Sequence, residues 1–360
     1  MADKGKKTLD QKVMLKTLEL KNRISCSPVE SCVLTEADGI IRDVSVDYYR
    51  AVAKGGAGLI FQGATAVCEY NRMDSHQAGI WSDEQIPGLK RIADAVHEEG
   101  GKIIIQLQHA GIRSDAERPL CPSEFVLKDK LGREMTTEEV HTAEQQFISA
   151  ARRAVEAGYD GVEIHAAHGW LVDEFLNSRV NKRTDEYGKD RLLFARNIYE
   201  GIRAVVPKDF IVGFRMSGFE PTIEDGIRHA EAFQSWGVDF LDISSNLWIW
   251  KQNMDAFKEE GFPYNEIIYS ASVIRKHVSI PLLAASGAVD RESAQGRLEL
   301  ADLDLIQVGR GMMIDTDFAN KVLRGEKPGG CLYCKTGCKF TLDQNTCPGL
   351  LLLKRGQAVK

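Results

Sequence analysis

Eight short apolar runs, separated by longer amphipathic stretches, constrain the fold of this chain more than any other feature. The runs are rich in Ile and Val and nearly continuous, which is typical of strands buried on both faces in a parallel sheet. They span residues 23–27, 59–62, 103–107, 161–164, 211–215, 240–243, 282–285 and 305–308. Strands that alternate with helices in this way predict an α/β fold, a single closed (β/α)8 TIM barrel.

The amphipathic stretches carry helix start and stop signals. Residues 82–100 open with Ser-x-x-Gln and residues 137–158 open with Thr-Thr-Glu-Glu, and both end at Gly. Residues 190–206 stop before Pro207, and residues 222–237 again end at Gly. An open doubly wound sheet is the alternative, and the lack of a Gly-x-Gly-x-x-Gly fingerprint disfavours it.

Charge and composition exclude several classes of function. The 360 residues include 46 Lys and Arg against 52 Asp and Glu, a net charge of −6. No basic excess exists to attract nucleic acid or an anionic membrane. Residues 1–12 are polar and Lys-rich without the apolar stretch of a secretory signal, and no run is long enough to span a membrane. We therefore expect a cytoplasmic protein whose cysteines are reduced.

Three segments are expected along the chain. Residues 1–19 form an N-terminal extension, residues 20–325 form the barrel, and residues 326–360 form a short Cys-rich C-terminal segment. The long aromatic-bearing connection at residues 248–264 follows the sixth strand and is a candidate lid over the site.

The active site of a TIM barrel lies at the carboxyl ends of its strands, so the residues there are candidates for chemistry. The candidates are Ser27, Pro28, Val29, Gly63, Gln106, His165, His168, Arg215, Ser286, Gly287, Gly309 and Arg310. The Ser-Gly and Gly-Arg pairs after the last two strands are typical of phosphate-binding loops, because glycine lets backbone N–H groups approach the anion and Arg neutralises it.

Two further features point to the chemistry. Arg215 ends an apolar strand, and an unpaired buried charge is so unfavourable that such an Arg normally serves a partner or ligand. A cation there stabilises negative charge on a flat ring, as in a reduced flavin. His165 and His168 can donate hydrogen bonds to one oxygen and polarise a carbonyl. Zinc is the alternative for the two histidines, but no third ligand is obvious nearby.

These motifs together resemble the old yellow enzymes, a family of FMN-dependent ene-reductases. The likeness runs from about residue 20 to residue 323. Its most specific blocks are Gln-Leu-Gln-His-Ala-Gly at 106–111, Gly-Tyr-Asp-Gly-Val-Glu-Ile-His-Ala-Ala-His-Gly-Trp-Leu at 158–171, and Asn-Lys-Arg-Thr-Asp-Glu-Tyr-Gly at 181–188. The resemblance implies hydride transfer from NADH or NADPH through FMN to the C=C bond of an α,β-unsaturated carbonyl compound.

The resemblance also implies roles for single residues. It places Ser27, Pro28, Val29, Gly63 and Gln106 against the flavin ring and Arg215 at the N1–C2 edge of that ring. It assigns the FMN phosphate to Ser286, Gly287, Gly309 and Arg310. It gives His165 and His168 the substrate carbonyl oxygen or the nicotinamide amide. Family members are often oligomers, so a homo-oligomer is expected.

Three positions depart from the family pattern. Trp170 stands where a Tyr usually protonates the substrate, and an indole N–H is far too weak an acid for that step. Glu30 follows the Ser-Pro-Val turn, and Ile112 shifts Arg113 by one residue. The departures leave an amine dehydrogenase or demethylase and an electron-relay protein open as alternatives. A non-redox aldolase or isomerase is disfavoured, because no strand end offers a Schiff-base Lys.

The cysteines Cys331, Cys334, Cys338 and Cys347 follow the barrel directly. Four clustered thiolates can ligate a [4Fe–4S] cluster or Zn²⁺, and their spacing alone does not distinguish the two. The resemblance to the dienoyl-CoA reductase and trimethylamine dehydrogenase branch implies [4Fe–4S], although the last spacer is shorter here. An empty, reduced set of thiols is the third alternative. Because the dinucleotide-binding half of those relatives does not follow within these 360 residues, we expect a ferredoxin-like electron donor.

Overall fold

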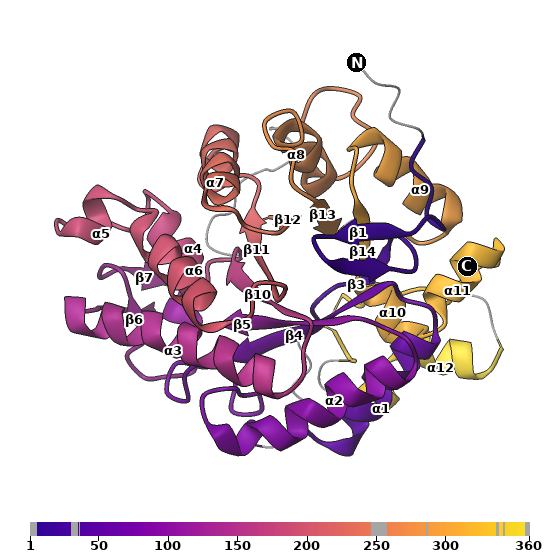
Figure 1. Ribbon diagram of the computed structural model, residues 1–360, viewed down its shortest axis with the longest axis horizontal. Helices are drawn as coiled ribbons and strands as arrows, with labels where there is room; N and C mark the ends of the chain where they lie inside the picture. Colours follow the sequence, from indigo (N-terminus) through magenta and orange to yellow (C-terminus); the bar gives the residue numbers. More distant parts are fainter. Residues whose placement is uncertain are drawn as a thin grey trace.

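The computed structural model describes residues 6–29, 35, 37–245, 258–285, 287–335, 338–340 and 343–356. Its centre is a closed barrel of eight parallel strands (Figure 1). In chain order the strands are β3 (Ile24–Cys26), β4 (Leu59–Ala66), β5 (Ile103–Gln108), β10 (Gly161–Ala166), β11 (Ile211–Ser217), β12 (Leu241–Ser244), β13 (Leu282–Ala285) and β14 (Leu305–Val308). All eight predicted runs are barrel strands, and the predicted TIM barrel is confirmed.

Helices surround the barrel (Figure 1). The outer helices are α1 (Asp43–Lys54), α2 (Ile86–Glu98), α3 (Thr137–Glu156), α6 (Leu193–Val205), α7 (Ile223–Trp236), α8 (Glu266–Ile274), α9 (Arg291–Leu300) and α11 (Phe318–Arg324). The predicted start signals work as capping boxes, in which Thr136 caps α3 with Glu139. The Gly that ends α7, Gly237, has a left-handed φ of 87°.

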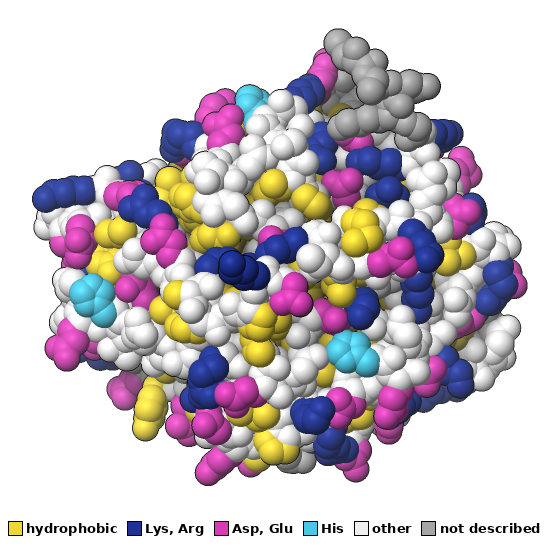
Figure 2. All heavy atoms as spheres, in the orientation of Figure 1, with side chains coloured by type: hydrophobic (Ala, Val, Ile, Leu, Met, Phe, Trp, Pro, Cys, Tyr) yellow, Lys and Arg dark blue, Asp and Glu magenta, His cyan; other side chains and the backbone are white. Residues whose placement is uncertain are grey.

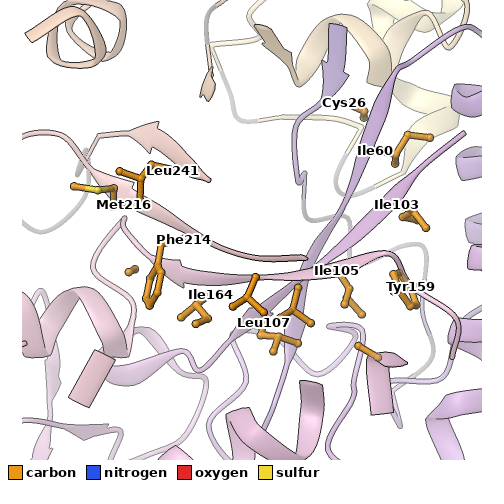
Figure 3. Packing of buried hydrophobic residues seen from close by; sticks show 14 of the residues in the cluster. Cys26, Ile60, Ile103, Ile105, Leu107, Tyr159, Ile164, Phe214, Met216 and Leu241 are labelled. Carbon is orange, nitrogen blue, oxygen red and sulfur yellow. The ribbon is translucent and has the colours of Figure 1, made fainter. Parts of the chain in front are cut away.

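Side chains on the outer faces of the strands form the main core. Figure 3 shows Ile105, Leu107, Ile164 and Phe214 projecting from the strands on the side that faces the helices. These positions alternate with residues that point into the barrel, as the two-residue period of a strand requires. The near-continuous apolar runs of the sequence therefore reflect burial on both faces.

A hairpin that the sequence did not reveal closes the amino-terminal end of the barrel. Strands β1 (Val13–Leu15) and β2 (Leu18–Leu20) pair antiparallel. Their fully buried Leu15 and Leu20 join an apolar cluster inside the barrel with Phe61, Ile104, Phe240 and neighbouring strand residues. The hairpin thus covers that end with buried apolar side chains, and the described cavity opens at the carboxyl ends of the strands.

The Cys-rich segment lies against the barrel beside the end of β14. Short helices α10 (Arg310–Ile314) and α12 (Pro348–Lys354) contribute to an apolar cluster that contains Met313, Ile314, Phe340 and Cys347. The ring of Phe340 also lies 6.4 Å from that of Tyr48 in α1. The four cysteines thereby lie near α10, whose residues Arg310, Met313 and Ile314 line the same space.

Smaller elements lie within the loops at the carboxyl ends of the strands. They are helices α4 (Leu171–Leu176) and α5 (Glu186–Lys189) and the short strand pairs β6 (Leu120–Cys121) with β9 (Arg133–Glu134) and β7 (Val126–Leu127) with β8 (Lys130–Leu131). Positive and negative side chains are interspersed over the face in Figure 2. No helix in the described residues is long and apolar enough to cross a membrane. Residues 248–257 of the candidate lid and Glu30 lie outside the described residues.

Candidate active site

A cavity of about 500 Å³ opens at the carboxyl ends of β3, β11, β13 and β14. Its volume falls in the range of small-molecule and cofactor sites. Eight of the predicted site residues line it: Ser27, Pro28, Val29, His168, Arg215, Gly287, Gly309 and Arg310. These residues lie far apart in the sequence, and closure of the barrel brings them to one place.

Arg215 lies at the base of this cavity and is almost fully buried. Its Nη1 donates to Asp242 Oδ2 at 2.9 Å, Ser27 Oγ at 3.2 Å and Gln307 Oε1 at 3.2 Å. Its Nε has no hydrogen-bond partner among the described residues. A buried guanidinium with an unsatisfied donor beside a cavity is a site for a ligand acceptor.

Two fully buried carboxyl groups lie below Arg215. Glu163 Oε2 accepts from Gln106 Nε2 at 2.6 Å, and Glu163 and Asp242 interact directly. Glu163 Oε1 and Asp242 Oδ1 have no donor among the described residues, so one proton between the two carboxyls satisfies both oxygens. Burial and the neighbouring Asp242 hold the pKa of Glu163 well above its usual range. One proton on this pair also makes the buried trio with Arg215 electrically neutral.

The two histidines form a pair after β10. Their ring centroids are 5.0 Å apart and their planes are nearly perpendicular. His168 has a left-handed φ of 62°, which turns the chain sharply, and its Nε2 lies 2.6 Å from Ser244 Oγ. Burial, followed by the nearby charges of Arg215 and Arg113, holds the pKa of His168 well below its usual range. Burial has the same effect on the pKa of His165, so both imidazoles are neutral at physiological pH.

Trp170 and Arg113 lie beside the histidine pair. The Trp170 ring lies 6.1 Å from that of His165. The Arg113 guanidinium lies 4.0 Å from the centroid of the Trp170 ring and donates to the His168 carbonyl oxygen at 2.7 Å. Burial lowers the pKa of Arg113 to about 10. Arg113 thus places a cation against the indole, and its hydrogen bond to the His168 carbonyl supports the turn at that residue.

Three other predicted FMN contacts are not among the described residues that line this cavity. Gly63 falls at an irregularity in the β4–β5 pairing, and its N–H donates to Tyr49 Oη at 3.0 Å. Gln106 points to Glu163, as described above, and neither residue lines the cavity. Ser286 lies outside the described residues. The flavin contacts assigned to these three residues therefore stay predictions.

The far end of the cavity has the character of an anion site. Gly287 has a left-handed φ of 67°. A Cβ at Gly309 would approach Val29 Cγ2 to 3.3 Å, so glycine keeps the cradle open. Arg310 lines this end and stacks on Tyr333, with the guanidinium carbon 4.3 Å from the ring centroid.

A second cavity of about 270 Å³ adjoins the first. Cys331, Cys334, Cys338 and Cys347 all line it, together with Arg310 and other residues of α10 and the Cys-rich segment. Among the described residues no group of three or more side chains converges closely enough to hold a single metal ion. The four predicted cysteine ligands therefore surround a cavity and do not converge on the position of a single metal ion.

Comparison with known proteins places this arrangement in a family. The profile of the NADH:flavin oxidoreductase / NADH oxidase family matches residues 11–327. The chain belongs to this family. The NADPH dehydrogenase of Bacillus subtilis (strain 168) is 34% identical over 333 residues, which cover 89% of this chain and 96% of that protein. Membership confirms the predicted old yellow enzyme relationship and the prediction of a flavin-dependent oxidoreductase.

Other similarities bear on the fold and on length. The old yellow enzyme homologue from Zymomonas mobilis superimposes with a TM-score of 0.79 at 24% identity, covering 91% of this chain and 95% of its own. The NADH oxidase of Thermoanaerobacter brockii is 32% identical over 349 residues, which cover 89% of this chain but 52% of that protein. This chain thus spans about half the length of that relative. The similarity does not test the dienoyl-CoA reductase branch, which stays a prediction.

Sequence reasoning missed several residues that shape the site. Glu163 and Asp242 are charged residues inside apolar strands, the signal that singled out Arg215. Each also stands two residues before a residue at the mouth, His165 or Ser244, and hence on the same inner face of its strand. The stack of Arg310 on Tyr333 carries no signal in the sequence, because it joins a strand end to a distant loop.

Proposed function

We propose that this protein is an FMN-dependent reductase that passes hydride from NADH or NADPH to the C=C bond of an α,β-unsaturated carbonyl compound. One observation carries the proposal above all others. His168 lines the same cavity as Arg215, and the neutral, buried ring of His165 lies directly behind it, with the two ring centroids 5.0 Å apart. His165 Nδ1 has no partner among the described residues, and an orphaned buried imidazole nitrogen beside a reductase cavity is a site for a substrate oxygen.

The residues present fit FMN. The cavity of about 500 Å³ joins a buried cation, Arg215, to an open glycine cradle and a second cation, Arg310. This order matches a flat electron-accepting ring at one end and a phosphate at the other. Bound FMN would supply the hydride carrier, which no side chain of this protein can replace.

The side chains of the chain itself hold the substrate and fix proton positions. Arg215 Nη2 lies 3.4 Å from Ser244 Oγ, so the Ser244 hydroxyl accepts there and donates to His168 Nε2. His168 then carries its proton on Nδ1 and can donate it to the substrate carbonyl. Polarising that oxygen draws electron density from the conjugated carbon and favours hydride addition.

The source of the one proton that the α-carbon needs differs from that of most relatives. Trp170 cannot release its indole proton, so we propose that water supplies the proton to the substrate α-carbon. The Arg113 cation lies over the Trp170 ring and holds the indole in place as an apolar wall. The step should therefore be slower and less stereoselective than in an enzyme with a Tyr acid.

The test combines cofactor identification and turnover. Protein purified without oxygen should show flavin absorption, lose it on addition of NADH or NADPH, and regain it on addition of cyclohexenone. His168→Ala should still be bleached by the nicotinamide but regain its colour more slowly. A protein without flavin contradicts the proposal. Bleaching by an amine without nicotinamide, and no reaction with the enone, would favour the amine dehydrogenase alternative.

We also propose that the Cys-rich segment, residues 326–360, holds a [4Fe–4S] cluster beside the FMN barrel of residues 20–325. A single Zn²⁺ needs four sulfurs at about 2.3 Å from one point. The cysteines instead line a cavity of about 270 Å³, a space suited to a larger group. Arg310 and Lys339 line the same cavity and favour an anionic cluster.

The cluster proposal names an electron donor and a direct assay. A cluster accepts single electrons, so a ferredoxin-like protein of the reducing cytoplasm is the donor class we propose. Iron and acid-labile sulfide analysis should give about four iron per chain. Cys338→Ser should lower the iron content while the protein still takes up flavin when FMN is supplied in excess. One zinc and no iron in wild-type protein would refute the cluster and leave the reductase proposal intact.

A further inference from the structure

The FMN cavity and the cysteine cavity share three residues: Arg310, Cys331 and Tyr333. Tyr333 lies between Cys331 and Cys334, and its ring faces the Arg310 guanidinium at 4.3 Å. Arg310 makes no salt bridge to a carboxylate in the described part of the chain. Its charge is therefore available to an anion, and its orientation depends on the aromatic ring against which it lies.

We propose that Tyr333 is the positioning residue for the flavin phosphate. The ring holds the otherwise mobile Arg310 side chain across the end of the cavity, where Gly287 and Gly309 leave room for the phosphate. Such a stack lowers the loss of rotamer freedom on binding and strengthens the anion contact. This inference rests on the proposed binding of FMN.

The position of Tyr333 depends in turn on Cys331. Tyr333 has a left-handed φ of 51°, a backbone conformation that L residues with side chains rarely adopt. Its N–H donates to Cys331 Sγ at 3.4 Å, which holds the turn in this shape. A thiolate bound to iron is a stronger acceptor than a thiol, because charge assists the hydrogen bond. Ligation of Cys331 should therefore stabilise the turn that presents Tyr333 to Arg310, and so link FMN retention to the cluster.

Riboflavin provides the control ligand, because it has the same ring system as FMN and no phosphate. Flavin-free wild-type protein, Tyr333→Phe and Tyr333→Leu should be titrated with each flavin, following flavin fluorescence. We expect Tyr333→Leu to bind FMN roughly three- to tenfold more weakly, the range of one cation–π contact. Tyr333→Phe should restore wild-type affinity for FMN, and riboflavin affinity should be the same in all three proteins.

The outcomes separate this inference from the proposed function. If wild-type protein binds neither flavin, the proposed function fails. If it binds FMN and Tyr333→Leu weakens FMN and riboflavin equally, or weakens neither, the positioning role is refuted. Unchanged circular dichroism and melting temperature in the Tyr333→Leu protein would exclude a general loss of fold as the cause.

A second measurement tests the link to Cys331. Cys331→Ser replaces the sulfur acceptor and removes one cluster ligand. It should weaken FMN about as much as Tyr333→Leu, leave riboflavin unchanged, and have little further effect when combined with Tyr333→Leu. Additive losses in the double variant would show that the two residues act independently and would overturn the coupling.

Discussion

Glu163→Gln provides the sharpest test of the buried polar network. Gln has the shape of a protonated Glu, so its oxygen can still accept from Gln106 Nε2 and its amide can donate to the orphaned Asp242 Oδ1. The substitution therefore preserves the packing of the fully buried site and removes the group that takes up a proton. Any change in stability should appear as a change in pH dependence rather than as a uniform loss.

The direction of the effect follows from the raised pKa of this carboxyl pair. Between the unfolded pKa of Glu, 4.5, and its raised value in the folded protein, the folded chain binds a proton that the unfolded chain has released. The free energy of unfolding of the wild type should therefore decrease as pH rises through this window. One bound proton corresponds to at most about 1.4 kcal/mol per pH unit while the pair keeps it.

The pKa of the partner shifts in the same direction. Burial raises the pKa of Asp242 from 3.8 to about 6. Because the two carboxyls interact directly, the two rises describe one shared proton and are not added. Because Asp242 also accepts from Arg215, its ionised form persists in Glu163→Gln, where the new amide donor supports it.

Urea unfolding of flavin-free protein, followed by tryptophan fluorescence at pH 5, 6 and 7, provides the assay. The difference between variant and wild type cancels the contributions of other buried acids, such as Asp173 and Glu174. Glu163→Gln should gain stability relative to wild type as pH rises from 5 to 7, by at most about 1.4 kcal/mol per pH unit. The exposed substitution Glu138→Gln is the control for loss of a carboxyl. Parallel pH curves for Glu163→Gln and wild type would refute the shared proton.

Three further predictions follow from the same structure. Because burial lowers the pKa of both His165 and His168, the rate of cyclohexenone reduction should not fall between pH 8 and pH 6; a rate that follows a pKa near 6.5 would contradict their neutrality. Trp170→Tyr restores an acid, so it should raise the rate of reoxidation by the enone about tenfold or more, and an unchanged stopped-flow rate would show that protonation is not limiting. Leu20→Ala removes a fully buried side chain from the amino-terminal end of the barrel and should lower the free energy of unfolding by about 2–5 kcal/mol, with flavin affinity unchanged. A loss below about 1 kcal/mol in urea titrations would show that the hairpin contributes little to closing the barrel.

The chain alone determined the architecture to a large extent. Strands buried on both faces must be apolar at nearly every position, so all eight left a local signal. Capping residues such as Thr136 and Gly237 act on neighbouring backbone groups, so their signals are also local. The β1–β2 hairpin escaped prediction because its strands are short and its burial depends on a barrel end built by distant segments.

The candidate site was predictable as a set of positions and not as a set of contacts. The ends of the strands follow from the fold, so Ser27, His168 and Arg215 could be expected at one mouth. The hydrogen-bond partners of these side chains could not be predicted, because they are distant in sequence. Arg215 donates to Ser27, which lies 188 positions earlier in the chain. Which donor meets which acceptor depends on strand register and on the inward face of each strand.

Tertiary structure alone therefore decided the chemistry of the interior. It placed Glu163 next to Asp242 and both near Arg215, whose positive charge offsets the negative charge of the carboxyl pair. It also set Arg310 on Tyr333 and joined the anion end of one cavity to the cysteines of another. Local periodicity determines which residues are buried, whereas the energy of a buried charge depends on neighbours that only the closed barrel supplies.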